Sequence, residues 1–330
     1  MDLYLISEAG QVSPLQVTNF PAISGGLPTR PDLAPSIVFI VAYFLLLFPT
    51  IWRAYTYRRP RMLLFTFIRL VLFLVIRIAT FALRADEAVT AELPFNPLPS
   101  LNIFIAEQIL LGVGFIVMLD LMVVFLQSHI SRTDVPLEDE TEFAQANRAP
   151  ILRYFITILH ASLIAAIAMG IVAGAMYSSA VSNPSKNDTV KALRIASTSI
   201  ALIVVGFIVI ISLLLLIRFP HLGVQRTLYL FITGGLLLVI PAFRLSTSVA
   251  THTSLTDLIS TATRVKFYIL QAMVEWIVAA LLVLVDVRVW FFAGGQEAKM
   301  MLDGTHPKEW RQRVKTDSPS AEVEAKFNPV

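Results

Sequence analysis

Long apolar segments separated by short polar connectors fill the chain from about residue 35 to residue 290. Crossing a hydrocarbon layer of about 30 Å takes about 20 mostly apolar residues in a helix, because a helix satisfies its own backbone hydrogen bonds there. Seven segments meet this requirement: 35–55, 62–83, 102–127, 151–177, 194–217, 226–249 and 266–290. The pattern predicts an all-α fold, a seven-transmembrane helix bundle.

The segments on either side of this region are polar. We expect an extracellular or lumenal tail at 1–34, a transmembrane domain at 35–292 and a disordered cytoplasmic tail at 293–330. The first 34 residues contain no basic stretch followed by an apolar core, so we expect no cleaved signal peptide. The first apolar segment is then expected to direct insertion and to remain in the membrane.

Composition agrees with a membrane environment. Hydrophobic residues make up 56% of the chain and charged residues only 15%, whereas soluble domains carry about 25% charged residues. Lipids are therefore the expected neighbours of most of the surface. The formal net charge of +3 is too small to indicate a nucleic-acid partner, and the absence of cysteine excludes disulfides and thiolate metal sites.

Basic residues in the connectors predict the orientation. The first connector carries four arginines within nine residues, namely Arg53, Arg58, Arg59 and Arg61. Short basic loops stay on the cytoplasmic side, so we expect the N-terminus outside and the C-terminus in the cytoplasm. Asn187 begins a sequon, Asn187-Asp188-Thr189, in the connector after the fourth segment and is a candidate glycosylation site. The acidic loop at 131–150 and the C-terminal tail are candidate surfaces for a cytoplasmic protein partner.

Several ionisable residues fall inside the apolar segments. Each costs at least about 2.5 to 3.5 kcal/mol in a bilayer, so each needs a partner, water or a function. In the second segment, Arg69, Arg77 and Arg84 share an arc of about 80°, and the last segment carries a polar stripe of its own. We expect both stripes to face the interior of the bundle. The candidate residues for a polar interior or ligand cavity are Arg69, Arg77, Glu107, Asp120, Arg244, Tyr268, Gln271, Glu275 and Asp286.

Matching the depths of these residues in antiparallel helices predicts specific pairs. At 1.5 Å per residue, Arg77 reaches the level of Glu107 or Glu275. Arg69 reaches the level of Asp120 or Asp286. The pairs have two interpretations: they hold the helices together, or they line a cavity for a small molecule, a lipid headgroup or protons.

The fourth segment carries a ridge of small residues at four-residue spacing: Ser162, Ala166, Gly170 and Gly174. Such a ridge allows a neighbouring helix to approach closely, and we expect it to serve packing within the bundle. His160 in the same segment is single and is expected to be a buried, hydrogen-bonded histidine.

The motifs of several enzyme and cofactor classes are missing. A retinal protein needs a lysine near the middle of its last helix, and the only lysine of the last segment, Lys266, lies at the outer end of that segment. The five histidines are scattered, and the sequence has no phosphate-binding glycine loop and no serine nucleophile elbow. We expect no enzyme, no cofactor and no metal.

Short motifs resemble a fungal family of seven-helix membrane proteins of uncharacterised function. They are Tyr43, Arg59-Pro60-Arg61, Ile76-Arg77-Ile78-Ala79-Thr80, Leu83-Arg84, Ala106-Glu107-Gln108-Ile109-Leu110, Gly112, Gly114, Phe243-Arg244, Glu275 and Asp286-Val287-Arg288. The resemblance covers residues 36 to 292. In layout the family is similar to the RTA-like lipid-translocating exporters and to fungal heptahelical receptor-like proteins, although this chain has no extracellular cysteine framework.

The resemblance implies a fungal source and a location in the plasma membrane or an endomembrane. It leaves three functions open. The first is a receptor-like sensor of a small ligand. The second is a translocator or exporter of lipids or amphiphiles, and the third is a non-catalytic scaffold or accessory protein of a pathway.

Overall fold

The computed structural model describes residues 4–6, 12–14, 25–56, 61–90, 100–130, 150–218, 223–249, 259–285 and 290–291. Asp286, the acidic loop at 131–149 and the tail at 293–330 lie outside the described residues. The helices are α1 (Leu33–Thr56), α2 (Arg61–Thr90), α3 (Leu101–Ile130), α5 (Pro150–Ala175), α6 (Tyr177–Ser182), α7 (Pro184–Arg218), α8 (Val224–Val249), α10 (Thr261–Phe267) and α11 (Val274–Leu284). A short 3-10 helix, η1 (Arg30–Asp32), precedes α1, and a π-helix, η3 (Tyr268–Met273), joins α10 to α11.

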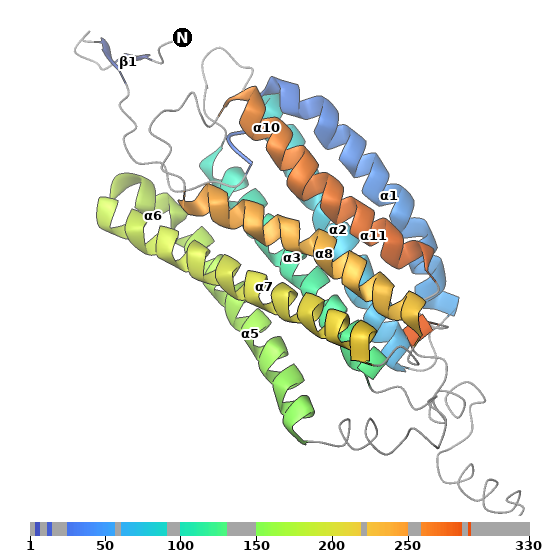
Figure 1. Cartoon of the computed structure of the whole chain (residues 1–330). Helices are drawn as coiled ribbons and strands as arrows, with labels where there is room; N and C mark the ends of the chain where they lie inside the picture. Colours follow the sequence, from blue (N-terminus) through green and yellow to red (C-terminus); the bar gives the residue numbers. More distant parts are fainter. Residues whose placement is uncertain are drawn as a thin grey trace, which may run out of the picture.

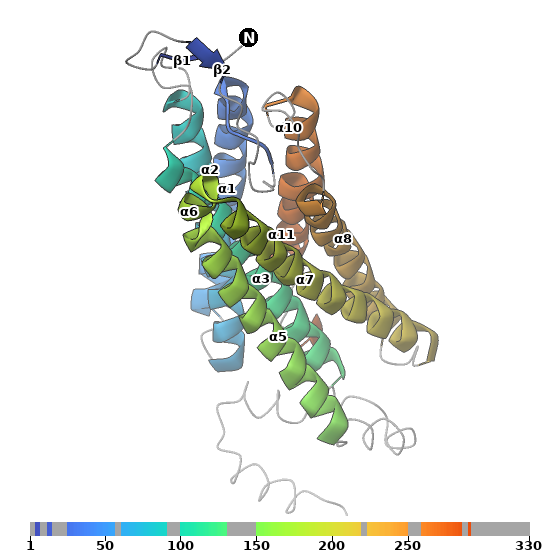
Figure 2. The same cartoon turned by 90° about the vertical axis from the view of Figure 1, so that its left-hand side faces the viewer.

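The long helices form a bundle with neighbours in chain order (Figures 1 and 2). Helix α1 packs on α2, followed by α3, α5, α7, α8 and α11, and α11 returns to α1. Helix α3 also contacts α7 and α8, so it is the central helix of the bundle. Apart from the antiparallel strands β1 (Tyr4–Ile6) and β2 (Val12–Pro14), the described elements are helical, as predicted.

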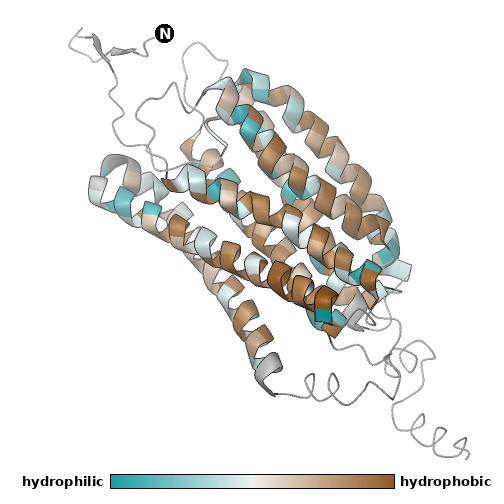
Figure 3. Ribbon diagram, in the orientation of Figure 1, coloured by the Kyte–Doolittle hydropathy of each residue, from teal (hydrophilic) through white to brown (hydrophobic). Residues whose placement is uncertain are grey.

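The outer surface of the helices is apolar. Figure 3 shows hydrophobic residues along the middle of the helices and hydrophilic residues gathered towards their ends. Helix α1 exposes a row of large apolar side chains, among them Phe44, Phe48 and Trp52. Within the described residues, seven helices have the length and apolar composition needed to cross a membrane, which agrees with a multi-pass membrane protein.

Two helices are longer than the sequence predicts. Helix α2 continues past residue 83 to Thr90. Helix α7 begins at Pro184, ten residues before the expected start, because Asn183 accepts a hydrogen bond from the backbone of Ser185 (3.1 Å) and proline suits a first helical turn. Asn187 therefore lies in the first turns of a helix, and the expectation that it sits in a connecting loop is wrong.

The segment before α1 is part of the bundle from residue 25 onwards. Gly25 and Gly26 both have a positive φ, and Gly25 packs so closely on the Phe267 ring that a Cβ atom there would lie 2.7 Å from it. Asp32 is fully buried. Residues 25–32 of the expected N-terminal tail therefore pack on the bundle, because Asp32 pairs with the buried Arg84.

The small residues of α5 face other helices, as predicted. The Ser197 hydroxyl of α7 donates a hydrogen bond to the carbonyl of Ala166 (2.8 Å), and Gly170 lies against the same serine. Gly174 faces Ile109 of α3 so closely that a Cβ atom would overlap the isoleucine side chain. The ridge is a packing surface within the bundle.

Replacing Gly174 with alanine should destabilise the protein by about 1 to 3 kcal/mol, because Ile109 must move away from the new methyl group. The measurement is the thermal denaturation midpoint of the purified full chain in detergent. Gly206→Ala is the matched control: a Cβ atom on Gly206 in α7 meets nothing within 4 Å, so this variant should be neutral or slightly stabilised. Equal loss in both variants would show that helix propensity, and not contact with Ile109, sets the effect.

Candidate functional site

Three groups of polar side chains lie inside or against the bundle. The first surrounds Arg84 near the end of the bundle where α1 begins, and we call it the N-terminal cluster. The second, the central cluster, surrounds Arg77 and Glu275. The third consists of Arg69, Asp120 and His160, and we call it the perimeter cluster.

The N-terminal cluster is built on the fully buried guanidinium of Arg84. It donates to Glu107 (2.8 Å), to Asp32 (3.1 Å), to the carbonyl of Gly25 (2.9 Å) and to the Tyr268 hydroxyl (3.1 Å). The segment 25–32, α3 and η3 therefore all meet at one side chain of α2. Buried charge-assisted bonds of this kind are strong and directional, so the cluster fixes this end of the bundle.

Asp32 and Tyr268 extend the N-terminal cluster. The guanidinium of Arg264 lies 2.8 Å from Asp32, and the backbone and hydroxyl of Thr29 donate to the same carboxylate (3.0 and 3.1 Å). The Tyr268 hydroxyl also lies 3.0 Å from the Ser36 hydroxyl. Tyr268, predicted to line a cavity, is thus held in a bonded network, and Glu107 pairs with Arg84 and not with Arg77.

The N-terminal cluster also contains an unsatisfied carboxyl group. Glu87 is fully buried on α2, and neither of its oxygens has a hydrogen-bond partner among the described residues. One oxygen of Glu107 also lacks a hydrogen-bond partner among the described residues.

The central cluster contains the predicted pair of Arg77 and Glu275. The Nε atom of Arg77 lies 2.6 Å from the Glu275 carboxylate, and both side chains are at most 1% exposed. The guanidinium of Arg77 also donates to the carbonyls of Leu110 and Leu111 (3.4 and 3.2 Å). Gly114 of α3 leaves room for the Arg77 guanidinium, because a Cβ atom on residue 114 would lie only 3.0 Å from that group. This prediction is confirmed.

Gln271 of the central cluster lies in the π-helix, four residues before Glu275. Its side chain is fully buried, and neither atom of its amide has a partner among the described residues. The wide turns of π-helices occur frequently at functional sites. Gln271 therefore remains a candidate for contact with a bound molecule or water.

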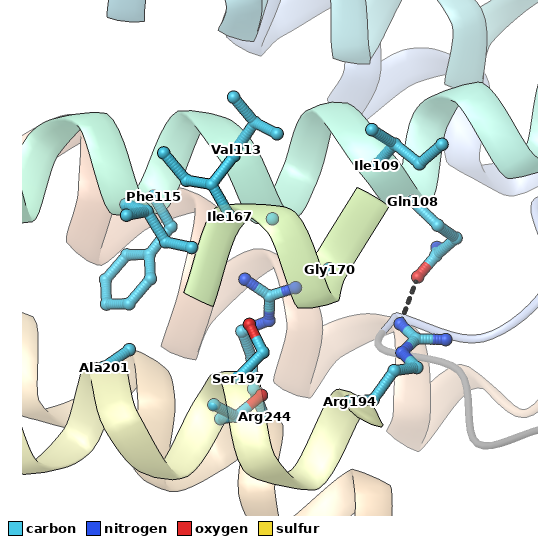
Figure 4. A pocket seen from close by; sticks show the side chains of 13 residues that line it. Gln108, Ile109, Val113, Phe115, Ile167, Gly170, Arg194, Ser197, Ala201 and Arg244 are labelled. Atoms are coloured by element: carbon cyan, nitrogen blue, oxygen red, sulfur yellow. Dashed lines mark hydrogen bonds between the residues drawn. The ribbon is translucent and has the colours of Figure 1, made fainter. Parts of the chain in front are cut away.

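A small cavity lies beside the central cluster, between α3, α5, α7 and α8 (Figure 4). Its volume is about 40 Å³, which holds about three water molecules. Two arginines line it, and Arg194 donates to Gln108 on the opposite wall (2.8 Å). The remaining wall is mostly apolar, with residues such as Ile116 and Ile167.

Arg244 is the second arginine of this cavity. Its Nε atom is buried without a hydrogen-bond partner, and in the described part of the chain it makes no ion pair within 4 Å. Glu275 attracts both Arg77 and Arg244, and Arg194 repels Arg244. Arg77 and Arg244 therefore share one carboxylate, and Arg194 adds a further positive charge to the cavity wall.

The perimeter cluster contains the second predicted pair. Arg69 Nε lies 3.1 Å from Asp120, and the other Asp120 oxygen lies 2.6 Å from His160 Nδ1. The exposed fractions are 39% for Arg69, 25% for Asp120 and 28% for His160. The pairing is confirmed, but the expectation that Arg69 faces the interior is wrong, because Arg69 lies at the edge of the buried arc of α2. His160 is bonded but not fully buried.

Sequence reasoning missed several residues of these clusters. The sequence places Asp32 in the N-terminal tail and Arg194 at the boundary of the fifth segment, and it predicts neither Glu87 nor Gln108 as a site residue. Arg84 carried a usable signal, because it lies two helical turns from Arg77 on the same stripe. Asp286, the other predicted partner for Arg69, lies outside the described residues.

Among the described residues, no group of three or more acidic, histidine or cysteine side chains has the arrangement of a metal site. Comparisons with models of known protein families, with characterised proteins and with solved structures each gave no match.

Proposed function

We propose that the chain is a receptor-like membrane protein that senses a small anionic ligand bound beside the central cluster. The observation that carries this proposal is the positive charge of Arg244: this buried arginine lines the cavity together with Arg194, and it makes no ion pair among the described residues because Glu275 is paired with Arg77. A buried charge without a partner is costly, so it favours any anion that enters. The cavity has room for a small carboxylate or an inorganic anion.

Binding of an anion has a mechanical consequence. Arg194 belongs to α7 and Arg244 to α8, and both repel each other across the cavity. An anion between them replaces this repulsion with attraction and draws α7 and α8 towards each other. Because the helices are long and packed, such a shift reaches the far ends of α7 and α8, and a ligand that binds one arrangement better shifts the population towards it.

The separation of the N-terminal cluster from the central cluster supports a sensor over a translocator. An aromatic layer separates the N-terminal cluster from the central cluster: Phe81 stacks on Tyr43 (5.9 Å between ring centroids) and on Phe39 (5.1 Å). Phe81 and Tyr43 are at most 1% exposed. A polar path for a moving substrate would have to open this layer.

Two other functions remain candidates. Movement of a lipid or amphiphile is favoured by the perimeter cluster, whose charges are partly exposed on the outside of the bundle. A scaffold role is favoured by the N-terminal cluster, because Arg84 makes its hydrogen bonds to residues of the chain itself and needs no ligand. The orientation with the N-terminus outside, and a cytoplasmic partner at residues 131–150 or the C-terminal tail, are part of the sensor proposal.

The test is the melting temperature of the purified full chain in detergent with phosphate, acetate or chloride, against gluconate, which is too large for the cavity. An anion at about 100 times its dissociation constant should raise the melting temperature by about 5 °C. Arg244→Met should remove this response. Without added anion it should melt at a higher temperature than the wild type, because an unpaired buried charge is gone.

Arg218→Met is the matched control, since Arg218 is exposed at the end of α7. This variant should keep the wild-type response to the anion. Two results would contradict the proposal: an unchanged melting temperature of the wild type with all three anions, or a full anion response in Arg244→Met.

A further inference from the structure

We propose that the perimeter cluster binds the headgroup of a zwitterionic phospholipid, with the phosphate on Arg69 and the positive end near Asp120. This site is separate from the cavity beside the central cluster. Its residues come from three consecutive helices of the ring: Arg69 from α2, Asp120 from α3 and His160 from α5. The proposal rests on their exposure, their depth and their charge.

The partly exposed side of the perimeter cluster faces outwards. Helix α3 is buried over most of its length, and Asp120 lies on a narrow partly exposed stripe with Val117 and Val124. On α2, Ile68 and Leu72 next to Arg69 are 46% and 48% exposed. These apolar neighbours are typical of a lipid-facing surface, so the three polar side chains open towards lipid and not towards the interior.

The depth of the cluster makes this exposure costly. At 1.5 Å per residue, Arg69 lies about 10 Å, Asp120 about 7 Å and His160 about 4 Å from the midpoints of their helices. A hydrocarbon layer has a half-thickness of about 15 Å. Partly exposed charges at these depths need a polar partner from outside the chain.

The donors and acceptors define the chemistry of that partner. Arg69 contacts Asp120 only through Nε, and its two terminal amino groups make no hydrogen bond to other described residues. They are suited to bind a phosphate group. Both Asp120 oxygens contact a neighbour, yet the side chain keeps 25% exposure, so the ammonium group of a headgroup can approach it from outside the bundle.

The net charge selects among headgroups. The charges of Arg69 and Asp120 are opposite, so this ion pair is a dipole and not a positive patch. A dipolar site favours a headgroup that carries both signs, such as phosphoethanolamine or phosphocholine, over a purely anionic one. The cavity beside the central cluster instead favours a purely anionic ligand, so the two sites differ in ligand class.

The first test uses the unmodified full chain in nanodiscs that contain a phosphatidylethanolamine with a photoreactive group near its headgroup. Labelled peptides are then identified by mass spectrometry. The residues around Arg69, including Phe65 and Leu72, should be labelled more than Phe44 and Phe48 on the exposed face of α1. Equal labelling of the two faces would overturn the proposal, and so would stronger labelling of α1.

The second test compares retained lipid in variants by native mass spectrometry after extraction from mixed ethanolamine and glycerol phospholipids. Arg69→Gln should lower the retained phosphatidylethanolamine by about tenfold, since it removes a charge-assisted hydrogen bond worth at least about 1.4 kcal/mol. Arg69→Lys should retain an intermediate amount, because lysine keeps the charge but not the forked geometry.

Arg218→Gln, at the exposed end of α7, is the control and should retain the wild-type amount. Unchanged retention in Arg69→Gln would overturn the proposal, as would a preference of the wild type for the glycerol phospholipid. The labelling experiment decides the question even if a variant does not fold. The anion response described above tests a different site, so failure of one proposal leaves the other intact.

Discussion

Replacing Arg84 with methionine should reduce the stability of the protein more than any other single change described here. The guanidinium is fully buried and joins Glu107, Asp32, Gly25 and Tyr268. Its removal leaves the buried Glu107 carboxylate without its cation, although Asp32 keeps Arg264. Breaking a buried pair in this way costs about 3 to 5 kcal/mol. We expect a large loss of folded protein, measured as the monodisperse fraction in size-exclusion chromatography and as the melting temperature.

Two variants make this result specific. Arg218→Met removes an exposed arginine at the end of α7 and should leave both measurements unchanged. Arg84→Met combined with Glu107→Gln should recover part of the loss, because the carboxylate that lost its cation is gone. Wild-type stability of Arg84→Met would show that the N-terminal cluster contributes no net stability.

Replacing Glu275 with methionine should have the second largest effect. The carboxylate is the partner of Arg77 at 2.6 Å and also attracts Arg244. Without it, buried arginines remain beside the cavity with no counter-charge, which should cost about 3 to 5 kcal/mol. The measurement is again the melting temperature of the full chain in detergent.

The pairing itself is tested by a double-mutant cycle. Arg77→Met alone should also destabilise the protein, whereas Arg77→Met with Glu275→Met should cost less than the sum of the two single changes. Exact additivity would mean that the two residues do not interact. Arg77→Met and Arg244→Met should act in opposite directions, since only Arg77 has a close carboxylate partner.

The sequence predicts the helices, and for most of them which side faces the interior, because a helix that crosses lipid must be about 20 residues long and apolar on its outer side. It also predicts that Arg77 pairs with Glu107 or Glu275 and that Arg69 pairs with Asp120 or Asp286, because depth in antiparallel helices follows from residue number. The structure shows the pairs with Glu275 and Asp120. The choice between the two partners depends on which helices are adjacent, and residue number does not give this.

Other features depend on contacts between distant segments and were not predictable. Burial of Asp32 follows from the fold of residues 25–32 onto Arg84, and nothing in the local sequence separates this segment from a free tail. The cavity depends on how α7 and α8 cross α3, and so does the role of Arg194. The exposure of Arg69 depends on the position of α5, which leaves part of α3 uncovered.

The π-helix from Tyr268 to Met273 gives the last membrane helix two separate registers. The Tyr43 hydroxyl donates to the carbonyl of Ala272 inside this wide turn (3.4 Å). One residue of an α-helix corresponds to a rotation of about 100° and a rise of 1.5 Å. If the π-helix changed to α-helical geometry, α11 with Glu275 would therefore rotate by about 100° relative to the part of the helix that carries Tyr268. Glu275 would then release Arg77, while Tyr268 would keep its hydrogen bond with Arg84.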